Sequence, residues 1–477
     1  MAEENLKQKT KRGLYWKLVE QFATYGMQFV IGIVMARLLT PEDYGITALP
    51  AVFIAIAGIF VGAGFGTAMI RKPELTEEDL STSFYYSTAA GVLIYGIFFF
   101  ASPWIASFYE APVLTPLIRV TALGFIFGPL GTPQSILLQR RLDFKTPTKI
   151  AVVCKIVAGI IGIAMAYAGY GLWSLVAASM GSQLLGLCLN WWAVRWVPRT
   201  GWSRQSFGYL WGFGNKFIAS QLLEVTYNNI APMVIGKFYS PTQLGIFNRA
   251  FSYASLPSQN LTGVISNVTF PVLSKMQDDE ARLAMNYRRI LRTTAFIVFP
   301  LLMLLSALAR PLVILMVTDK WAACVPLLQI ICFNLMWYPI HSINLNLLLV
   351  RGRSDLFLRL EVIKKVIGIV VLIVTLPLGL KVYCWGGVAF SVICLLVNTR
   401  YTSQLINLGF WRQMGDLRLT LLLSALTFGI AFSTTLLVSN LWLQLLVGGG
   451  LATIVYLGGA WILRMEELRE VRYLVRF

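Results

Sequence analysis

Long apolar segments joined by short polar loops are the feature that most constrains this chain. Each is long enough to cross the hydrocarbon core of a bilayer as a helix, which takes about 20 residues for about 30 Å. The sequence is 57% hydrophobic and 13% charged, and its apolar runs lack the alternation of a membrane β-barrel. We therefore expect an all-α integral membrane protein with about 14 transmembrane helices. The expected helices run over 13–39, 45–70, 81–102, 113–138, 150–169, 172–194, 208–237, 243–273, 288–317, 322–350, 358–379, 383–408, 418–438 and 442–463.

The distribution of charge indicates how these helices cross the membrane. The chain has 40 Lys and Arg against 22 Asp and Glu, a formal charge of +18. Most of the basic residues fall in the two terminal segments and in alternate loops, which is the positive-inside pattern. Both termini are therefore expected in the cytoplasm. The basic loops are expected to attract anionic membrane lipids, and a nucleic-acid partner is not indicated.

A ten-residue stretch occurs twice, two hundred positions apart. The copies are Arg37-Leu-Leu-Thr-Pro-Glu-Asp-Tyr-Gly-Ile46 and Lys237-Phe-Tyr-Ser-Pro-Thr-Gln-Leu-Gly-Ile246. In both, a basic residue ends an apolar helix and Ser/Thr-Pro begins the next one. A coincidental helix-turn-helix is the alternative to duplication, but internal repeats are common in transporter folds.

Six expected helices separate the copies, so both halves have the same orientation. We expect two parallel six-helix lobes around a central cavity, with two accessory helices after them. The domains would be 1–195 (helices 1–6), 196–411 (helices 7–12) and 412–477, the last with a basic, amphipathic cytoplasmic tail on the membrane surface.

Polar side chains repeat along one face of the first and seventh expected helices. Three- and four-residue spacing places them in stripes, and Glu20, Thr24 and Gln28 are offset by two hundred from Ser220, Glu224 and Asn228. The stripes are either a satisfied structural network or the lining of a shared aqueous cavity. Their members are Lys17, Glu20, Gln21, Thr24 and Gln28, then Lys216, Ser220, Glu224 and Asn228.

Further cations fall within helix limits, at Arg119, Lys155 and Arg249. An ionised side chain at mid-helix costs about 2.5–3.5 kcal/mol on insertion scales and needs a partner or a wet cavity. Each of the three could instead snorkel to the interface. With Lys17 and Lys216 they would make the cavity cationic, because only Glu20 and Glu224 oppose them. The predicted cargo is therefore anionic, with a phosphate or carboxylate group.

Neither a metal site nor a nucleotide site is indicated. His341 is alone beside an aromatic cluster and is expected to be a packing residue. The six cysteines are expected to be reduced packing residues, with a Cys324–Cys384 bridge left open. Without an ATP-binding motif, no cofactor is expected, and the energy would come from the substrate gradient or from Na+ or H+ coupling at Glu20 and Glu224.

The opening of the chain resembles a known family. Gly13-Leu-Tyr-Trp16 and Ile33-Val-Met-Ala-Arg-Leu-Leu-Thr-Pro-Glu-Asp-Tyr-Gly45, with Asp143-Phe-Lys145 after Gln139-Arg-Arg141, are similar to the bacterial polysaccharide exporters. These are the Wzx-type flippases of the multidrug/oligosaccharidyl-lipid/polysaccharide superfamily, and the likeness is closest to the colanic-acid-exporter branch. The resemblance implies two lobes around a cavity, an undecaprenyl-diphosphate-linked oligosaccharide as cargo, alternating access, and the polysaccharide polymerase machinery as a partner.

The sequence therefore predicts a flippase in the cytoplasmic membrane of a bacterium, and not an enzyme. It would move lipid-linked repeat units from the inner to the outer leaflet for surface polysaccharide assembly. One alternative is an ion-coupled small-molecule antiporter of the same superfamily, which the cationic balance disfavours. A second is a membrane glycan polymerase or ligase, which would need a larger outer loop with carboxylates, a metal site or a nucleophile.

Overall fold

The computed structural model describes the backbone of residues 2–475, which is helical with short connections and without strands over that range. Side chains are described except for residues 2–15, 17, 18, 22, 264, 267, 268 and 473–475. Within these limits, nine stretches are long and apolar enough to cross a membrane. The protein is therefore an all-α, multi-pass membrane protein. The nine stretches are Pro41–Gly62, Glu77–Phe108, Leu114–Arg140, Lys145–Tyr167, Glu280–Ala307, Cys324–Val350, Leu380–Ile406, Phe410–Leu437 and Leu441–Ile462.

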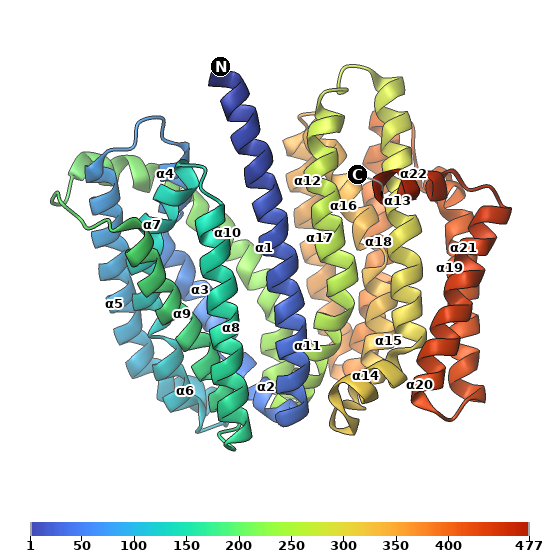
Figure 1. Cartoon of the computed structure of the whole chain (residues 1–477), viewed down its shortest axis with the longest axis horizontal. Helices are drawn as coiled ribbons and strands as arrows, with labels where there is room; N and C mark the ends of the chain where they lie inside the picture. Colours follow the sequence, from blue (N-terminus) through green and yellow to red (C-terminus); the bar gives the residue numbers. More distant parts are fainter. Residues whose placement is uncertain (1, 476–477) are drawn as a thin grey trace. The chain divides into compact units, whose positions relative to one another are not determined.

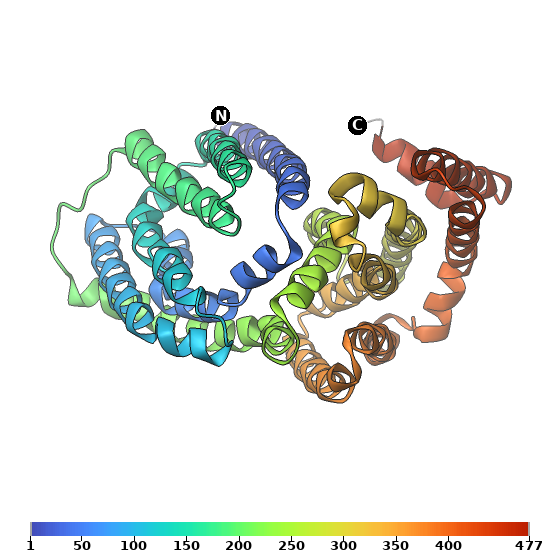
Figure 2. The same cartoon turned by 90° about the horizontal axis from the view of Figure 1, so that it is seen from below.

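Contacts divide the chain into two compact units, Met1–Gly245 and Ile246–Phe477. The helices of unit 1 (Figures 1 and 2) are α1 (Ala2–Leu38), α2 (Pro41–Ala48), α3 (Ala51–Gly62), α4 (Phe65–Arg71), α5 (Glu77–Phe108), α6 (Leu114–Thr121), α7 (Gly124–Arg140), α8 (Lys145–Tyr167), α9 (Trp173–Val194) and α10 (Arg204–Phe238). The next helix, α11 (Pro241–Ser255), begins in unit 1 and continues into unit 2.

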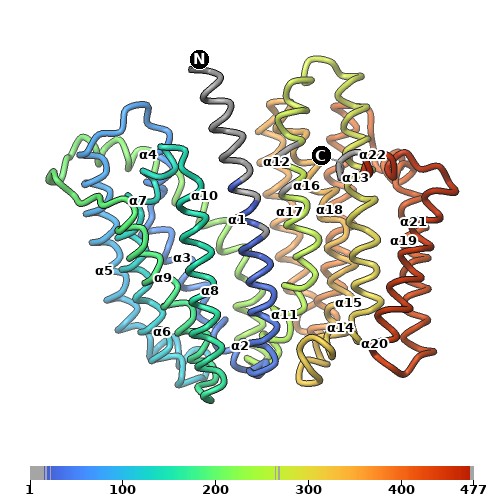
Figure 3. The backbone as a smooth tube through the Cα atoms, in the orientation of Figure 1, coloured from blue at the N-terminus to red at the C-terminus, as the bar shows by residue number. Residues whose placement is uncertain are grey.

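Unit 2 continues with the remaining elements, which Figure 3 follows as a backbone trace. They are η1 (Leu256–Asn260), α12 (Leu261–Ser274), α13 (Glu280–Ala307), α14 (Ala309–Val317), η2 (Asp319–Trp321), α15 (Cys324–Leu335), α16 (Tyr338–Val350), α17 (Ser354–Thr375), η3 (Leu376–Leu378), α18 (Leu380–Ile406), α19 (Phe410–Leu437), α20 (Leu441–Leu443), η4 (Gln444–Gly448), α21 (Gly449–Ile462) and α22 (Glu466–Val475).

The helix expected over 45–70 is divided into three. Pro50 separates α2 from α3, because its ring removes a backbone donor. Ala63 and Gly64 then separate α3 from α4 with left-handed φ values of 44° and 69°. The helix expected over 113–138 is also divided, at Ala122 and Leu123 between α6 and α7, but there the backbone keeps right-handed angles.

The core of unit 1 joins α4 and α5 to the start of α10. Phe65, Met69 and Leu80 are buried in one cluster with Leu210 and Ile218 of α10. The seventh expected helix thus packs on the unit that holds the first six, on α3, α4 and α5. The proposed lobe boundary at residue 195 was drawn from the repeat, whereas this division follows packing.

A buried polar network joins three helices of unit 2. Asn344 of α16 accepts a hydrogen bond from the Thr402 hydroxyl of α18 at 2.6 Å. The Gln413 side-chain amide of α19 donates to the same Asn344 oxygen at 3.1 Å and also donates to Leu408 O. Since buried amides are costly when unpaired, these bonds fix the helices in register.

The C-terminal helix α22 is bound to its own unit. Its Leu468 and Val471 pack on the cluster of Phe296, Tyr456 and neighbouring residues. Its carboxylates pair with the arginines of α13: Glu467 with Arg292, and Glu470 with Arg289. Its described apolar residues Leu468 and Val471 are therefore half-buried against their own unit, and the position on the membrane surface stays a prediction.

Candidate functional site

The polar stripe of α1 lies beside α8. Thr148 of α8 brings its hydroxyl to 3.4 Å from Glu20 Oε2 and donates to its own helix at Phe144 O, 2.7 Å away. Eleven residues further along α8, a Cβ on Gly159 would lie 2.6 Å from Ile31 Cδ1 of α1. These two contacts define the face of α8 that packs on α1.

Lys155 is on this same face of α8. It follows Thr148 by seven residues, two turns of helix, and precedes Gly159 by four. The two contacts therefore place it level with the middle of the α1 stripe, near Thr24 and Gln28. Among the described residues its ammonium group has no hydrogen-bond or ion-pair partner, although the side chain is half-buried.

Thr24 gives the α1 stripe an unused hydrogen-bonding group. Its Oγ1 is buried and has no partner in the described part of the chain. A buried hydroxyl without a partner costs about 1–3 kcal/mol of folding free energy. The Thr24 hydroxyl is therefore a candidate to bind a ligand. Gln21 is half-buried and Gln28 is exposed, so the stripe runs from the helix contact to an open face.

The stripe of α10 has a different environment. Its packed face carries Leu210, Gly214 and Ile218, and a Cβ on Gly214 would lie 2.6 Å from Ala63 O. The polar residues are on the other face of the helix. All four of them are exposed: Lys216, Ser220, Glu224 and Asn228. The two stripes have the same spacing in sequence but different environments. The described side chains of the α1 stripe are mostly half-buried, whereas those of the α10 stripe are exposed.

Arg119 and Arg249 are held by aromatic rings. Arg119 of α6 donates from Nε toward Phe99 O and Ser102 Oγ of α5, at 3.2 and 3.1 Å, and stacks 4.3 Å above the Phe99 ring. Arg249 of α11 lies 4.9 Å above the ring of Trp321. Stacking of this kind suits the planar guanidinium. Lys17 lies in α1, but its side chain is outside the described residues.

The two copies of the repeated turn meet within unit 1. Thr40 and Ser240 cap the helices that follow, each accepting a hydrogen bond at 3.2 Å from the amide three residues on. A Cβ on Gly45 would overlap Pro241 O, and one on Gly245 would overlap Pro41 O. The first turns of α2 and α11 thus cross with backbone against backbone, which only glycine permits.

Lys237, at the end of α10, ties the second copy of the turn to α5. Its ammonium group donates to Phe108 O at 2.6 Å and to Glu110 Oε1 at 3.0 Å. The repeated basic residue therefore joins the last turns of two helices. The sequence predicted that Lys237 ends an apolar helix, but it did not predict this contact.

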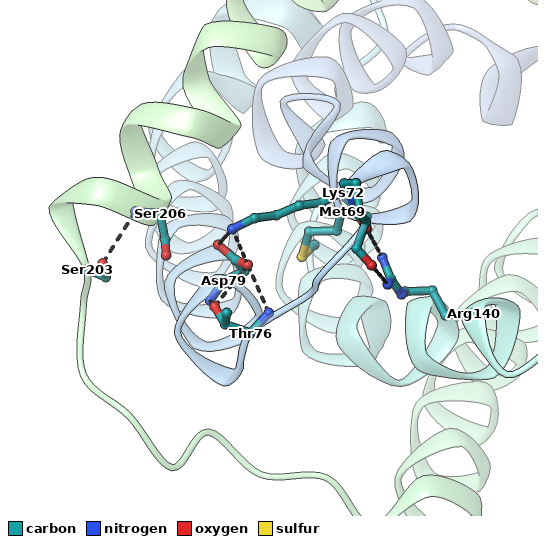
Figure 4. Close-up of polar contacts among 8 residues, drawn as sticks. Met69, Lys72, Thr76, Asp79, Arg140, Ser203 and Ser206 are labelled. Carbon is teal, nitrogen blue, oxygen red and sulfur yellow. Dashed lines mark hydrogen bonds and ion pairs between the residues drawn. The ribbon is translucent and has the colours of Figure 1, made fainter.

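At the other end of these helices, a polar cluster fixes the α4–α5 loop (Figure 4). Lys72 Nζ lies 2.6 Å from Asp79 Oδ2, and Asp79 also accepts from the backbone of Thr76 at 3.0 Å. Arg140 donates to Met69 O and Pro73 O, each at 2.8 Å. Arg140 belongs to the Gln-Arg-Arg motif of the resemblance, and its role here is to bind a loop.

The α9–α10 linker is attached beside this loop. Trp196 Nε1 donates to Glu77 Oε1 at 3.0 Å, and Ser203 N donates to Thr82 Oγ1 at 3.1 Å. The segment that follows the expected domain boundary at residue 195 is therefore anchored to the start of α5.

Asp143 begins the Asp-Phe-Lys part of the motif, and its side chain orders the start of α8. It precedes α8 and accepts hydrogen bonds from Thr146 N at 3.1 Å and Thr146 Oγ1 at 2.7 Å. Burial acts to raise the pKa of the Asp143 carboxyl, but these bonds and nearby Lys145 outweigh it, so the net shift is downward. The ionised carboxylate also suits a helix N-terminus.

Sequence analysis missed a charged pair in α17. Lys364 donates to Glu361, with side chains only 13% and 29% exposed. In the same unit, the ring of buried His341 bonds Ser391 Oγ at 2.9 Å and Asn398 Nδ2 at 3.3 Å. Glu and Lys three apart within the apolar run 356–374 were the available signal. The packing role expected for His341 agrees with these bonds, and all six cysteines are free thiols.

Known proteins are similar to this chain along most of its length. A family model described as polysaccharide biosynthesis protein matches residues 34–326. The teichuronic acid biosynthesis protein TuaB of Bacillus subtilis (strain 168) is 24% identical over 88% of this chain and 89% of its own length. The lipopolysaccharide biosynthesis protein WzxC of Escherichia coli (strain K12) is 25% identical over 76% of this chain and 74% of its own.

The fold has a solved counterpart. The structure of the lipid II flippase MurJ in an inward closed conformation matches with a TM-score of 0.75 and 16% sequence identity. The match covers 94% of this chain and 98% of that one. At this identity the likeness shows a shared fold.

Proposed function

Because the chain belongs to the polysaccharide biosynthesis protein family, we propose that it is a flippase for lipid-diphosphate-linked oligosaccharide repeat units. It turns the head group of an undecaprenyl-diphosphate-linked glycan from the inner to the outer leaflet by alternating access. The protein lies in the cytoplasmic membrane of a bacterium with both termini inside, and its fourteen helices form two six-helix lobes and an accessory pair. The names of TuaB, WzxC and MurJ support this assignment.

One observation links the proposed function to particular residues. Lys216, Ser220, Glu224 and Asn228 form an exposed polar face on a helix whose opposite face is packed. In a membrane protein such a face needs water or a polar ligand, because charged groups are costly in hydrocarbon. We therefore take the substrate pathway to be lined by this face of α10.

Two lysines are the proposed diphosphate ligands. Lys216 stands on the exposed face of α10, and half-buried Lys155 has no anionic partner among the described residues. Both ammonium groups can donate charge-assisted hydrogen bonds to phosphate oxygens. The remaining stripe residues would bond sugar hydroxyls, while Lys17, Arg119 and Arg249 stay predicted members of the same cationic site.

Ion coupling is assigned to the stripe carboxylates, and no resident cofactor is required. Glu20 lies at the α1–α8 contact and Glu224 on the open face of α10. A proton or a sodium ion bound at either would change the charge that faces the diphosphate.

Transport of a labelled prenyl-diphosphate oligosaccharide in proteoliposomes tests these residues. Lys155→Gln and Lys216→Gln are each expected to lower the transport rate about tenfold, since a charge-assisted hydrogen bond contributes about 1.5–3 kcal/mol. Lys149→Gln is the matched control, because Lys149 is an exposed lysine on another face of α8.

The outcomes separate the function from its site assignment. Normal transport in both lysine variants would overturn the assignment and leave the function standing. Wild-type protein that transports a small organic ion against a gradient, and not the lipid-linked glycan, would favour the antiporter.

A further inference from the structure

A groove between α17 and α18 carries two arginines without a counter-ion. It has a volume of about 500 Å3 and is lined by Leu356, Arg359, Ile363, Val397, Arg400, Tyr401 and Gln404. Its lining residues all belong to unit 2, and none of them is among the residues proposed to bind substrate. Nothing in the proposed transport cycle uses it.

The two arginines lie at the same level of an antiparallel helix pair. The short η3 turn joins α17 to α18, and a Cβ on Gly386 would lie 2.8 Å from Thr375 Oγ1. This contact fixes the register and places Arg359 within about one turn of Arg400. Two guanidinium groups at such a separation repel each other, so the groove is incomplete without an anion.

The acids nearest in sequence are already engaged. Asp355 pairs with Arg353 at 2.9 Å, and Glu361 pairs with Lys364. Within the described residues, no carboxylate lies within ion-pair distance of either groove arginine. Both arginines are exposed, so an anion from the surroundings can reach them.

The polarity of the groove changes along the helix axes, from an apolar part to a charged and polar part, as the polarity of a phospholipid does. Ile363 and Val397 line the part farthest from the C-terminal end of α18, and the two arginines, Tyr401, Gln404 and Leu356 line the part toward that end. The neighbouring surface of α17 is apolar and open, with Leu358, Val362 and Val366 more than half exposed. A soluble phosphate would use only the arginines, whereas a lipid uses the whole surface.

We propose that this groove binds the phosphodiester of an anionic phospholipid such as phosphatidylglycerol. Arg359 and Arg400 donate to the phosphate oxygens, an acyl chain lies along Ile363 and Val397, and Gln404 bonds the polar head group. Basic pockets between transmembrane helices recognise anionic lipids in this way. The lipid holds α17 against α18 by removing the repulsion between the arginines.

Lipid titration of the full-length purified protein tests the proposal, with native mass spectrometry and the thermal unfolding midpoint as readouts. Phosphatidylglycerol is expected to bind and to raise the midpoint, and phosphatidylcholine is not. Arg359→Gln and Arg400→Gln are each expected to weaken phosphatidylglycerol binding about tenfold. Arg418→Gln, which removes an exposed arginine of α19, is expected to bind as the wild type does.

A charge reversal distinguishes loss of the site from loss of the fold. Arg359→Glu would place a carboxylate opposite Arg400 and remove the repulsion, so without lipid this variant should unfold at or above the wild-type midpoint, and it should no longer respond to phosphatidylglycerol. The proposal is overturned if the glutamine variants bind phosphatidylglycerol normally, or if inorganic phosphate raises the midpoint equally. Displacement of phosphatidylglycerol by an equimolar prenyl diphosphate would also overturn it, by making the groove part of the substrate path.

Discussion

Gly45 and Gly245 each pack against the backbone of the proline that opens the other's helix. Pro41-Glu-Asp-Tyr-Gly45 and Pro241-Thr-Gln-Leu-Gly245 are the two copies of the repeated turn, so the repeat is visible as a reciprocal contact. Because neither glycine can carry a side chain without moving the partner backbone, the contact explains why glycine stands at both positions.

Substitution of either glycine by alanine should therefore destabilise the protein. A Cβ at Gly45 would overlap Pro241 O, and overpacking of this kind costs about 1–3 kcal/mol. Gly96→Ala is the control, since nothing lies within 4 Å of a Cβ built there, and alanine has a higher helix propensity than glycine. A lower thermal midpoint for Gly45→Ala than for Gly96→Ala is expected. Equal midpoints would contradict the contact.

Asp79 should be the most sensitive residue of the α4–α5 loop. It is fully buried, pairs with Lys72 and caps α5. Asp79→Asn leaves Lys72 without its partner, and breaking a buried pair costs about 3–5 kcal/mol. Asp355→Asn breaks the exposed pair with Arg353 and should lower the stability much less, because solvent screens such a pair. The thermal midpoints of the two variants test this ranking, and the reverse order would refute it.

Arg140 should keep the α4–α5 loop closed. Arg140→Gln removes the bonds to Met69 O and Pro73 O, so amides of residues 69–76 should exchange hydrogen faster in detergent solution. Arg141 is exposed and supplies the neighbouring control, Arg141→Gln. Identical exchange in the two variants would show that Arg140 does not fix the loop.

A substitution at Thr24 should lower transport without lowering stability. Thr24→Val removes a buried hydroxyl that has no described partner, so the thermal midpoint should stay the same or rise. If the hydroxyl bonds the glycan, the transport rate should fall about fivefold, the effect of one hydrogen bond of about 1 kcal/mol. Unchanged transport would remove Thr24 from the pathway.

The helical, membrane-spanning character of the chain could be predicted from its apolar segments, and several helices were close to their observed bounds. The break at Ala63–Gly64 was not predicted, and neither was the packing of Gly64 against Phe217 of α10, whose ring lies 2.6 Å from a Cβ built on Gly64. The reciprocal contact of Gly45 and Gly245 also needs the three-dimensional structure, although the repeat itself was visible in sequence.

The residue types of the candidate site and their spacing along each helix could be predicted from the sequence. The burial and the contacts of each side chain could not. The spacing of Ser220, Glu224 and Asn228 predicted a polar face, and they are exposed together. The same spacing on α1 could not show that Glu20 lies against Thr148 of α8, 128 residues away. Glu361 and Lys364 were not predicted as a site, because opposite charges three residues apart on a helix can pair with each other and do not stand out as a lone buried cation does.

The central claim is tested most directly by following the leaflet position and the chain length of a labelled undecaprenyl-diphosphate oligosaccharide in proteoliposomes of the wild-type protein. The account predicts that the head group becomes accessible on the opposite face, that the glycan keeps its length, and that empty liposomes show no movement. A lengthened glycan would identify a polymerase or ligase, and a head group that stays on its original face would contradict the flippase.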